Sequence, residues 1–289
     1  TEAEKKIRLC NGGIVCGDGS KVFSWVAQVG NDNKAREFYL SDLPPIARKD
    51  NRLTHVVEIS PEEMEGANTR AELAQLEKLM QIKLRRKHMD NGVTLTDPDS
   101  IFFCCDTAIE SDVSIGPNVV FGPDVNIKSN VEIMPFCHIE GAIIDSGSKI
   151  GPFARIRPGS VIRKKKKIGN FVEVKNAKIG SETKISHLSY IGDADIGDKT
   201  NIGAGTITCN YDGFMKYKTT IGKEAMIGSN TALIAPVTIG NGAYIGAGSS
   251  IYQNVPDNAL GITRAPQIIK EGWVPEFKQK KMREKAKKG

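Results

Sequence analysis

The chain has 289 residues, of which 26% are charged and 39% hydrophobic, close to the average of globular proteins. This composition excludes a disordered or collagen-like chain, and no apolar run reaches the ~18 residues that a membrane-spanning helix requires. Of the net charge of +6, the segment from Glu276 to Gly289 alone supplies +5. We therefore expect a solvated basic tail, no nucleic-acid partner and no membrane insertion.

The sequence also predicts the cellular setting of the protein. Thr1 opens the chain without the apolar stretch of a signal peptide, so we expect a cytoplasmic protein. The 6 cysteines form no Cys-x-x-Cys pair, which favours buried thiols over zinc ligands or disulfides.

The first part of the chain, residues 1–68, mixes short elements of both kinds. Strand-like runs at 13–16 and 55–59 lie on either side of a candidate helix at 21–29. This is α/β material, and it is too short for an independent nucleotide-binding domain.

A linker helix is predicted over 69–90. Thr69 and Glu72 have the spacing of a helix capping box, and Asn91-Gly92 can end the helix. The residues expected on its apolar face are Leu73, Leu76, Met80 and Leu84.

Residues 91–262 carry a repeat. From Ile109 to Ile251, 23 positions recur six or occasionally five residues apart; 20 of them are Ile, and Gly follows 12 of them. A period of six fits a short strand plus a corner, and three such units close one triangular coil. We predict about eight coils of a parallel β-helix in which isoleucines stack inward. The glycines are expected to provide the corner conformations and the five-residue steps to be shortened corners.

Two segments depart from the repeat. Between Ile202 and Ile221 the spacing is 19 residues, so a loop must leave the prism there, and loops on rigid scaffolds often carry function. Arg163 and the run Lys164–Lys167 lie within one coil, and we expect that run to form solvated surface.

Several motifs resemble one bacterial enzyme family. They are Arg155-Ile-Arg157-Pro-Gly, Gly169-Asn-Phe-Val-Glu173-Val-Lys175, His187-Leu-Ser-Tyr190, Asn201-Ile-Gly-Ala204, Asn210-Tyr211 and Lys270-Glu-Gly-Trp273. The family is the bifunctional N-acetylglucosamine-1-phosphate uridylyltransferase and glucosamine-1-phosphate acetyltransferase.

The resemblance implies a fold class. The family joins a Rossmann-like nucleotidyltransferase domain through a long helix to a left-handed β-helix. We therefore expect a mainly β chain, in which residues 1–68 are the end of the α/β domain, 69–90 the linker helix, 91–262 a left-handed parallel β-helix with hexapeptide repeats, and 263–289 a C-terminal arm.

The resemblance also implies acetyl transfer from acetyl-CoA, the co-substrate, to the amine of glucosamine-1-phosphate, in UDP-N-acetylglucosamine biosynthesis. His187 resembles the family's general base, a task that suits imidazole near neutral pH. Arg157 and Lys175 lie 18 residues apart, one coil, and should stack as a phosphate clamp. Glu173 is expected to hold His187 or an adjacent polar group.

Other site residues follow from the resemblance alone. The substrate-binding positions that it implies, besides the clamp, are Tyr190, Asn201 and Lys216, the last of which is expected to reach a neighbouring subunit. The acetyl-CoA-binding positions that it implies are Ala204, Asn210, Tyr211, Ser229, Ala247 and Arg264.

For uridylyl transfer the chain holds only two matching residues. Asn11 resembles a nucleotide-sugar contact and Asn68 a magnesium ligand, while the family's glycine-rich loop, basic residues and magnesium-binding aspartate are not found in the sequence. Mg²⁺ is therefore expected only for the family's uridylyltransferase half, and we expect this N-terminally truncated chain not to carry out that reaction.

The resemblance further implies a homotrimer acting on small-molecule substrates. Another hexapeptide-repeat acyltransferase and a non-catalytic β-helix scaffold stay open as alternatives. A zinc hydratase of this fold would need three histidines, and the repeat region has only His138 and His187.

Overall fold

The computed structural model describes residues 2, 4–6 and 8–287, and it divides the chain into two compact units, Thr1–Glu77 and Lys78–Gly289. The division falls within helix α4 (Arg70–Asp90), whereas the sequence placed a boundary after residue 68. Each unit is described by itself.

The first unit is a small helical cluster. Its elements are η1 (Glu4–Lys6), α1 (Val22–Val26), η2 (Leu40–Asp42), α2 (Leu43–Lys49) and α3 (Pro61–Met64). Trp25 packs with Val29, Leu43 and Ile46, and its indole nitrogen donates to Asp50 at 2.8 Å.

The strand-like runs of the first unit do not form strands. Residues 13–16 and 55–59 have no regular structure, and the helix expected at 21–29 is confined to α1. Val56 and Val57 are 81% and 82% exposed. A strand requires a neighbour for its backbone groups, and β-rich side chains alone cannot supply one.

The predicted linker helix is confirmed. Glu72 accepts hydrogen bonds from the backbone of Asn68 and Thr69, and Thr69 accepts one from Glu72, which forms the capping box. Gly92 follows the helix with φ +86°. Of the expected apolar face, however, only Leu84 is buried, and Leu73 and Met80 are exposed.

The buried face of α4 instead closes one end of the β-helix. Gln81 pairs through both amide atoms with the backbone of Phe103, and Arg85 donates to the carbonyl of Ile101 at 2.9 Å. His88 stacks on Phe103 with ring centroids 4.6 Å apart. Polar side chains thus pair backbone groups that the first coil leaves open.

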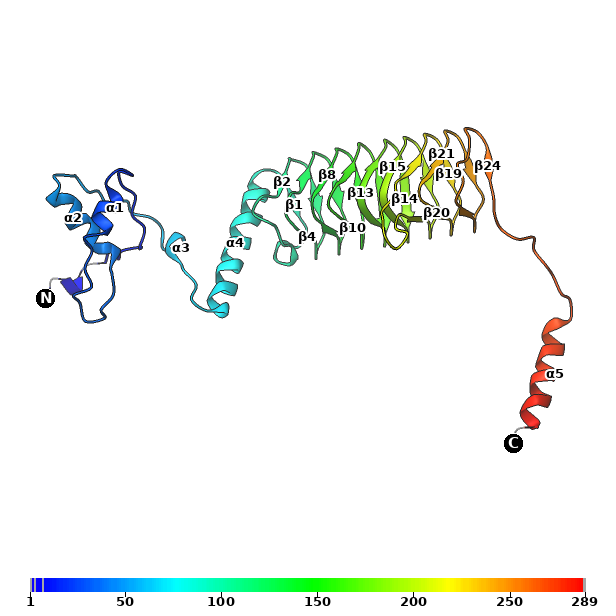
Figure 1. Cartoon of the computed structure of the whole chain (residues 1–289), viewed down its shortest axis with the longest axis horizontal. Helices are drawn as coiled ribbons and strands as arrows, with labels where there is room; N and C mark the ends of the chain where they lie inside the picture. Colours follow the sequence, from blue (N-terminus) through cyan, green and yellow to red (C-terminus); the bar gives the residue numbers. More distant parts are fainter. Residues whose placement is uncertain (1, 3, 7, 288–289) are drawn as a thin grey trace. The chain divides into compact units, whose positions relative to one another are not determined.

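The second unit is a three-faced parallel β-helix, whose coils stack side by side along its axis (Figure 1). Its first face consists of β1 (Thr94–Leu95), β3 (Ser114–Ile115), β6 (Glu132–Ile133), β9 (Lys149–Ile150), β12 (Lys167–Asn170), β14 (Lys184–His187), β16 (Asn201–Ile202), β19 (Met226–Ile227), β22 (Tyr244–Ile245) and β24 (Leu260–Gly261).

The other two faces share two long strands. The second face consists of β4 (Val120–Phe121), β7 (His138–Ile139), β10 (Arg155–Ile156), β17 (Ile207–Cys209), β20 (Ala232–Ile234) and β23 (Ser250–Ile251). The third consists of β2 (Ala108–Ile109), β5 (Asn126–Ile127), β8 (Ala142–Ile144), β11 (Ser160–Ile162), β18 (Thr219–Ile221) and β21 (Val237–Ile239). β13 (Glu173–Ile179) and β15 (Tyr190–Ile196) bend round the corner and belong to both.

The core of the β-helix is a stack of isoleucines. Ile150, Ile168, Ile185 and Ile202 are in register from coil to coil and are at most 2% exposed. Burial of each such side chain stabilises the fold by roughly 1.5–3 kcal/mol. The predicted fold class, mainly β with a left-handed parallel β-helix of hexapeptide repeats after a helix, is confirmed.

The repeat glycines have a different role from the one expected. A Cβ at Gly169 would lie 2.0 Å from the carbonyl oxygen of Ser186, and one at Gly228 would lie 2.4 Å from the amide of Ala247. The left-handed corner conformations are divided between non-glycine residues, such as Asn118 with φ of +57°, and other glycines, such as Gly151 and Gly159 with φ of +95° and +81°. Gly169 and Gly228 therefore permit close stacking of coils, while only some of the glycines provide the corners that were expected of them.

The basic run at 164–167 is exposed as expected at three positions and departs from expectation at Lys166. Lys166 is 2% exposed, and its ammonium donates to the carbonyl of Lys164 at 3.0 Å. Burial lowers the pKa of Lys166 to about 8. Lys166 lies two residues before Ile168, the inward-facing position that Thr183 and Thr200 occupy in later coils, which is why it is buried.

Candidate active site

His187 lies at the end of β14, next to a neutral partner. Its Nδ1 is 2.6 Å from Oδ1 of Asn170, which ends β12 and is the strand-register partner of His187. With the amide oxygen as acceptor, Nδ1 carries the proton and Nε2 keeps its lone pair. Of the two alternatives expected for Glu173, the structure shows the second: Glu173 pairs with the adjacent Arg157, and Asn170 is the partner of His187.

Three predicted coenzyme contacts continue this line from coil to coil. The pairing of β14 with β16 aligns His187 with Ala204, and the pairing of β16, β19 and β22 aligns Ala204 with Ser229 and Ala247. Arg264 donates to the carbonyl of Ala247 at 2.9 Å. Small side chains here leave the backbone accessible to a long, thin ligand.

The predicted phosphate clamp lies on the second face. Ile156 and Val174 are register partners, which places Arg157 and Lys175 one above the other, as the 18-residue spacing predicted. Arg157 donates to Glu173 at 2.7 Å, and this bond raises the pKa of the guanidinium. The buried Nε of Arg157 has no hydrogen-bond partner among the residues described here, so one donor faces no acceptor.

A second charged cluster adjoins Lys175. The amides of Asn176 and Asn210 donate to the two oxygens of Asp193, and Asn210 is 8% exposed. Burial would raise the pKa of Asp193, but these amides and the charges of Lys175 and Lys216 lower it. Lys175 in turn lowers the pKa of Lys216 through close contact and like-charge repulsion.

The extruded loop carries Lys216. Residues 210–218 leave the prism between β17 and β18, and Tyr211 and Lys216 form an antiparallel bridge at its base. Phe214 is 93% exposed at the tip. The loop predicted from the interrupted repeat is therefore confirmed.

The structure places the other predicted contacts on neighbouring coils. Tyr190, predicted for the substrate, begins β15 and is half-buried, two residues after the corner that follows His187. Asn201, also predicted for the substrate, begins β16 on the first face, where its amide is 3.2 Å from the sulfur of Met226. Tyr211, predicted for acetyl-CoA, is 59% exposed. The predicted residues thus lie at two corners, since His187 precedes one and Lys175 precedes the next.

Asn11 and Asn68 are exposed in the first unit. Asn11 caps its own turn by accepting from Gly13 at 2.8 Å. In the described part of the chain, no group of three or more His, Cys, Asp or Glu side chains could hold a metal ion. One exposed amide does not fit magnesium, which prefers several carboxylate or phosphate oxygens.

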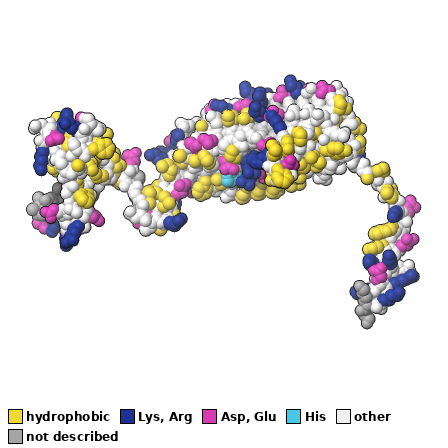
Figure 2. All heavy atoms as spheres, in the orientation of Figure 1, with side chains coloured by type: hydrophobic (Ala, Val, Ile, Leu, Met, Phe, Trp, Pro, Cys, Tyr) yellow, Lys and Arg dark blue, Asp and Glu magenta, His cyan; other side chains and the backbone are white. Residues whose placement is uncertain are grey.

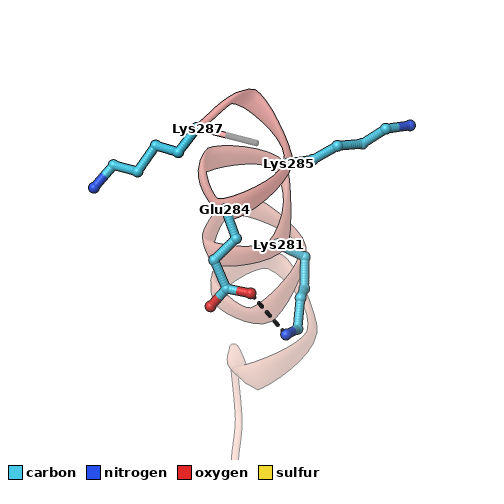
Figure 3. Close-up of a pocket in the computed structure, with 4 residues that line it drawn as sticks. All are labelled: Lys281, Glu284, Lys285 and Lys287. Atoms are coloured by element: carbon cyan, nitrogen blue, oxygen red, sulfur yellow. Dashed lines mark hydrogen bonds and ion pairs between the residues drawn. The ribbon is translucent and has the colours of Figure 1, made fainter. Parts of the chain in front are cut away.

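The C-terminal helix α5 (Trp273–Ala286) has its own surface hollow (Figure 3). Lys281 and Glu284 form an ion pair at 2.8 Å, while Lys285 and Lys287 point in different directions (Figure 3). Of the helices described, none is long and apolar enough to cross a bilayer.

Sequence reasoning missed Asn170 and Asp193. Each lies 17 residues, one coil with a five-residue step, before a residue that was named: His187 and Asn210. Coil spacing was the signal that could have found both.

Comparison with known proteins identifies relatives. The family model for bacterial transferase hexapeptide repeats matches residues 124–158 and 218–253. The bifunctional protein GlmU of Sphingopyxis alaskensis is 49% identical over 286 residues, which is 99% of this chain and 63% of that protein. The chain is a relative of the bifunctional protein GlmU. The GlmU of Paramagnetospirillum magneticum is 48% identical over 288 residues, and there too the chain spans 64% of the relative's length.

A solved structure that resembles the chain is more distant than these GlmU relatives. LpxA from Acinetobacter baumannii aligns over 59% of this chain and 71% of its own, with 17% identity and a TM-score of 0.46. This overlap is too limited to support any inference about the chemistry of the site.

Proposed function

We propose that this chain transfers the acetyl group of acetyl-CoA to the amine of glucosamine-1-phosphate, giving N-acetylglucosamine-1-phosphate. The observation that carries the proposal is the pairing of His187 with Asn170 at the head of the line Ala204, Ser229 and Ala247, with the cations Arg157 and Lys175 across one corner. Base, coenzyme groove and phosphate anchor thus lie on neighbouring coils of the β-helix.

The base follows from the hydrogen bond to Asn170. The amine nitrogen attacks the thioester carbonyl carbon, and Nε2 of His187 accepts the proton that the amine loses. The carbon–sulfur bond then breaks, and the thiolate of coenzyme A leaves and takes up a proton. A neutral amide partner orients the ring without adding a charge beside it.

The cations have a binding role in this reaction. Arg157 and Lys175 would hold the sugar phosphate, Arg157 through its guanidinium, since the side chain is 32% exposed, and Lys175 as a point charge. Tyr190 lies between His187 and the level of Lys175 along the coil, whereas Asn201 lies level with Lys184 on the first face. Arg264 and Ala247 lie at the far end of the coenzyme line.

The proposal includes a homotrimer acting in the cytoplasm. An exposed apolar ridge supports a subunit contact next to the site: Phe136, Phe153 and Phe171 stack at centroid distances of 4.8 and 5.0 Å and are 45–54% exposed. Leu188, which follows His187, extends the ridge and is 61% exposed. Light scattering should give three times the chain mass of 31.4 kDa.

The acetyltransferase proposal is tested by thiol release. The purified chain is incubated with acetyl-CoA and glucosamine-1-phosphate, and free thiol is measured with a chromogenic disulfide. Release that depends on the sugar phosphate supports the proposal; release that ignores it, or none at all, overturns it. Glucosamine without the phosphate serves as the matched substrate control for the clamp.

A further inference from the structure

The extruded loop is held at both feet by one strand. Asp193 and Asp195 lie two residues apart on β15. Asp193 accepts a hydrogen bond from the amide of Asn210, where the loop begins, and Asp195 pairs with Lys218 at 2.5 Å, where it ends. The two anchors differ in the number of groups that surround each carboxylate.

The Asp195 anchor is an ordinary surface ion pair. Lys218 and Asp195 are 56% and 39% exposed, and such pairs contribute little to stability. No other partner of the Asp195 side chain is found in the residues described.

The Asp193 anchor joins several groups of the candidate site. One carboxylate oxygen accepts from Asn176 at 2.6 Å and the other from Asn210, and the ammonium groups of Lys175 and Lys216 act on the same carboxylate. Asp193 has φ +48°, so the strand turns the corner at this residue and directs the carboxylate towards both lysines.

The ammonium groups of Lys175 and Lys216 need a negative charge nearby to stay close together. Lys175 and Lys216 lie close enough to repel each other, and without a negative charge the mobile loop lysine would move away. With Arg157 paired to Glu173, the carboxylate of Asp193 is the charge that balances the second pair of cations.

We propose that Asp193 is a positioning residue of the acetyltransferase site: it fixes the amide of Asn210 and keeps the ammonium groups of Lys175 and Lys216 together before the sugar phosphate binds. The inference rests on the proposed function. Asp193 does not touch the reacting atoms; it acts through Asn210 and the two lysines.

The test compares Asp193→Asn with Asp195→Asn, a control that frees the other foot of the loop. Each variant is assayed for thiol release, with kcat and KM for the sugar phosphate measured from pH 6 to 10, together with its melting temperature. Asp193→Asn should lower kcat by about tenfold or more, the effect of losing one charged hydrogen bond of ~1.5 kcal/mol. Asp195→Asn should stay within about twofold of wild type.

The pH profile separates positioning from simple loss of structure. The charged groups that face Lys216 are Lys175 on β13 and Asp193 and Tyr190 on β15. Because the charge of Asp193 favours the protonated lysine, its removal lets Lys216 lose its proton at a lower pH. The alkaline rise in KM for the sugar phosphate should therefore begin at a lower pH in Asp193→Asn than in wild type, and at an unchanged pH in Asp195→Asn.

The outcomes distinguish the two proposals. If the wild-type enzyme releases no thiol, the proposed function fails and this inference fails with it. If the wild-type enzyme is active and both variants give the same kcat and the same alkaline limb, Asp193 is not a positioning residue. If Asp193→Asn lowers kcat only in proportion to a fall in melting temperature, with an unmoved alkaline limb, the role is structural and the inference is also overturned.

Discussion

At neutral pH the buried ammonium of Lys166 should lower the free energy of unfolding. Its ammonium is buried in a position that later coils fill with Thr183 and Thr200, and burial lowers its pKa from 10.5 to about 8. A shift of this size corresponds to about 3–4 kcal/mol at ~1.4 kcal/mol per unit, which is the net cost with the bond to the carbonyl of Lys164 in place. Lys166→Met, which keeps the length of the stem, should stabilise the chain by about that amount at pH 7.

The pH dependence makes this prediction specific. Between pH 8 and 10.5 the unfolded lysine holds a proton that the folded one has lost, so stability rises with pH across this window and is flat below it. Urea unfolding at pH 7 and pH 10 should show this rise in the wild-type chain and in the exposed control Lys167→Met, but not in Lys166→Met. A Lys166→Met chain that is less stable than wild type at pH 7, or that keeps the rise, would refute the reasoning.

Four further outcomes are expected. His187→Ala should lower kcat by roughly 10²- to 10⁴-fold, measured by thiol release, with little change in KM for the sugar phosphate. Arg157→Ala should raise that KM with kcat nearly unchanged, because the phosphate is bound similarly in ground and transition states; an unchanged KM would contradict the clamp. The 289-residue chain should release no pyrophosphate from UTP and N-acetylglucosamine-1-phosphate with magnesium, and release by a preparation of confirmed mass would argue against this reading. Burial lowers the pKa of His88 below 6.5. The stability that comes from burying the neutral ring is therefore fully present above pH 6.5 and is lost as the pH falls through the lowered pKa. His88→Phe should reduce this fall of the melting temperature at acid pH, measured by thermal unfolding.

The repeat made most of the β-helix predictable. The interior of every coil is alike, and each short strand must place one large apolar side chain in it. Ile168 and Ile185 are both 0% exposed, as the spacing predicted. The burial of Lys166 was not predicted, because the expectation rested on its charge and not on its position two residues before Ile168. The strands expected at 13–16 and 55–59 failed because pairing partners are a property of the whole fold.

The sequence predicted which residues of the candidate site lie near one another, but not which hydrogen bonds they form. Spacing placed Arg157 over Lys175, but it left two partners open for Glu173, His187 or an adjacent polar group. Glu173 pairs with Arg157, and Asn170 pairs with His187. Coil spacing determines which residues are stacked. Their hydrogen bonds depend on side-chain rotamers, and these depend on the backbone conformation at the corner, as at Asp193.

The two ends of the prism are finished differently. At one end Gln81 and Arg85 pair the open backbone groups of the first coil, while at the other β24 is the outermost strand and Leu260 is 65% exposed. In a stack where each coil bonds only to its neighbours, thermal opening proceeds inward from the less protected end. That end holds the bond between Arg264 and Ala247. The end of the groove that we propose for the coenzyme is therefore the part that frays first. A bound coenzyme would cover that end, so that ligand affinity and local folding become one equilibrium.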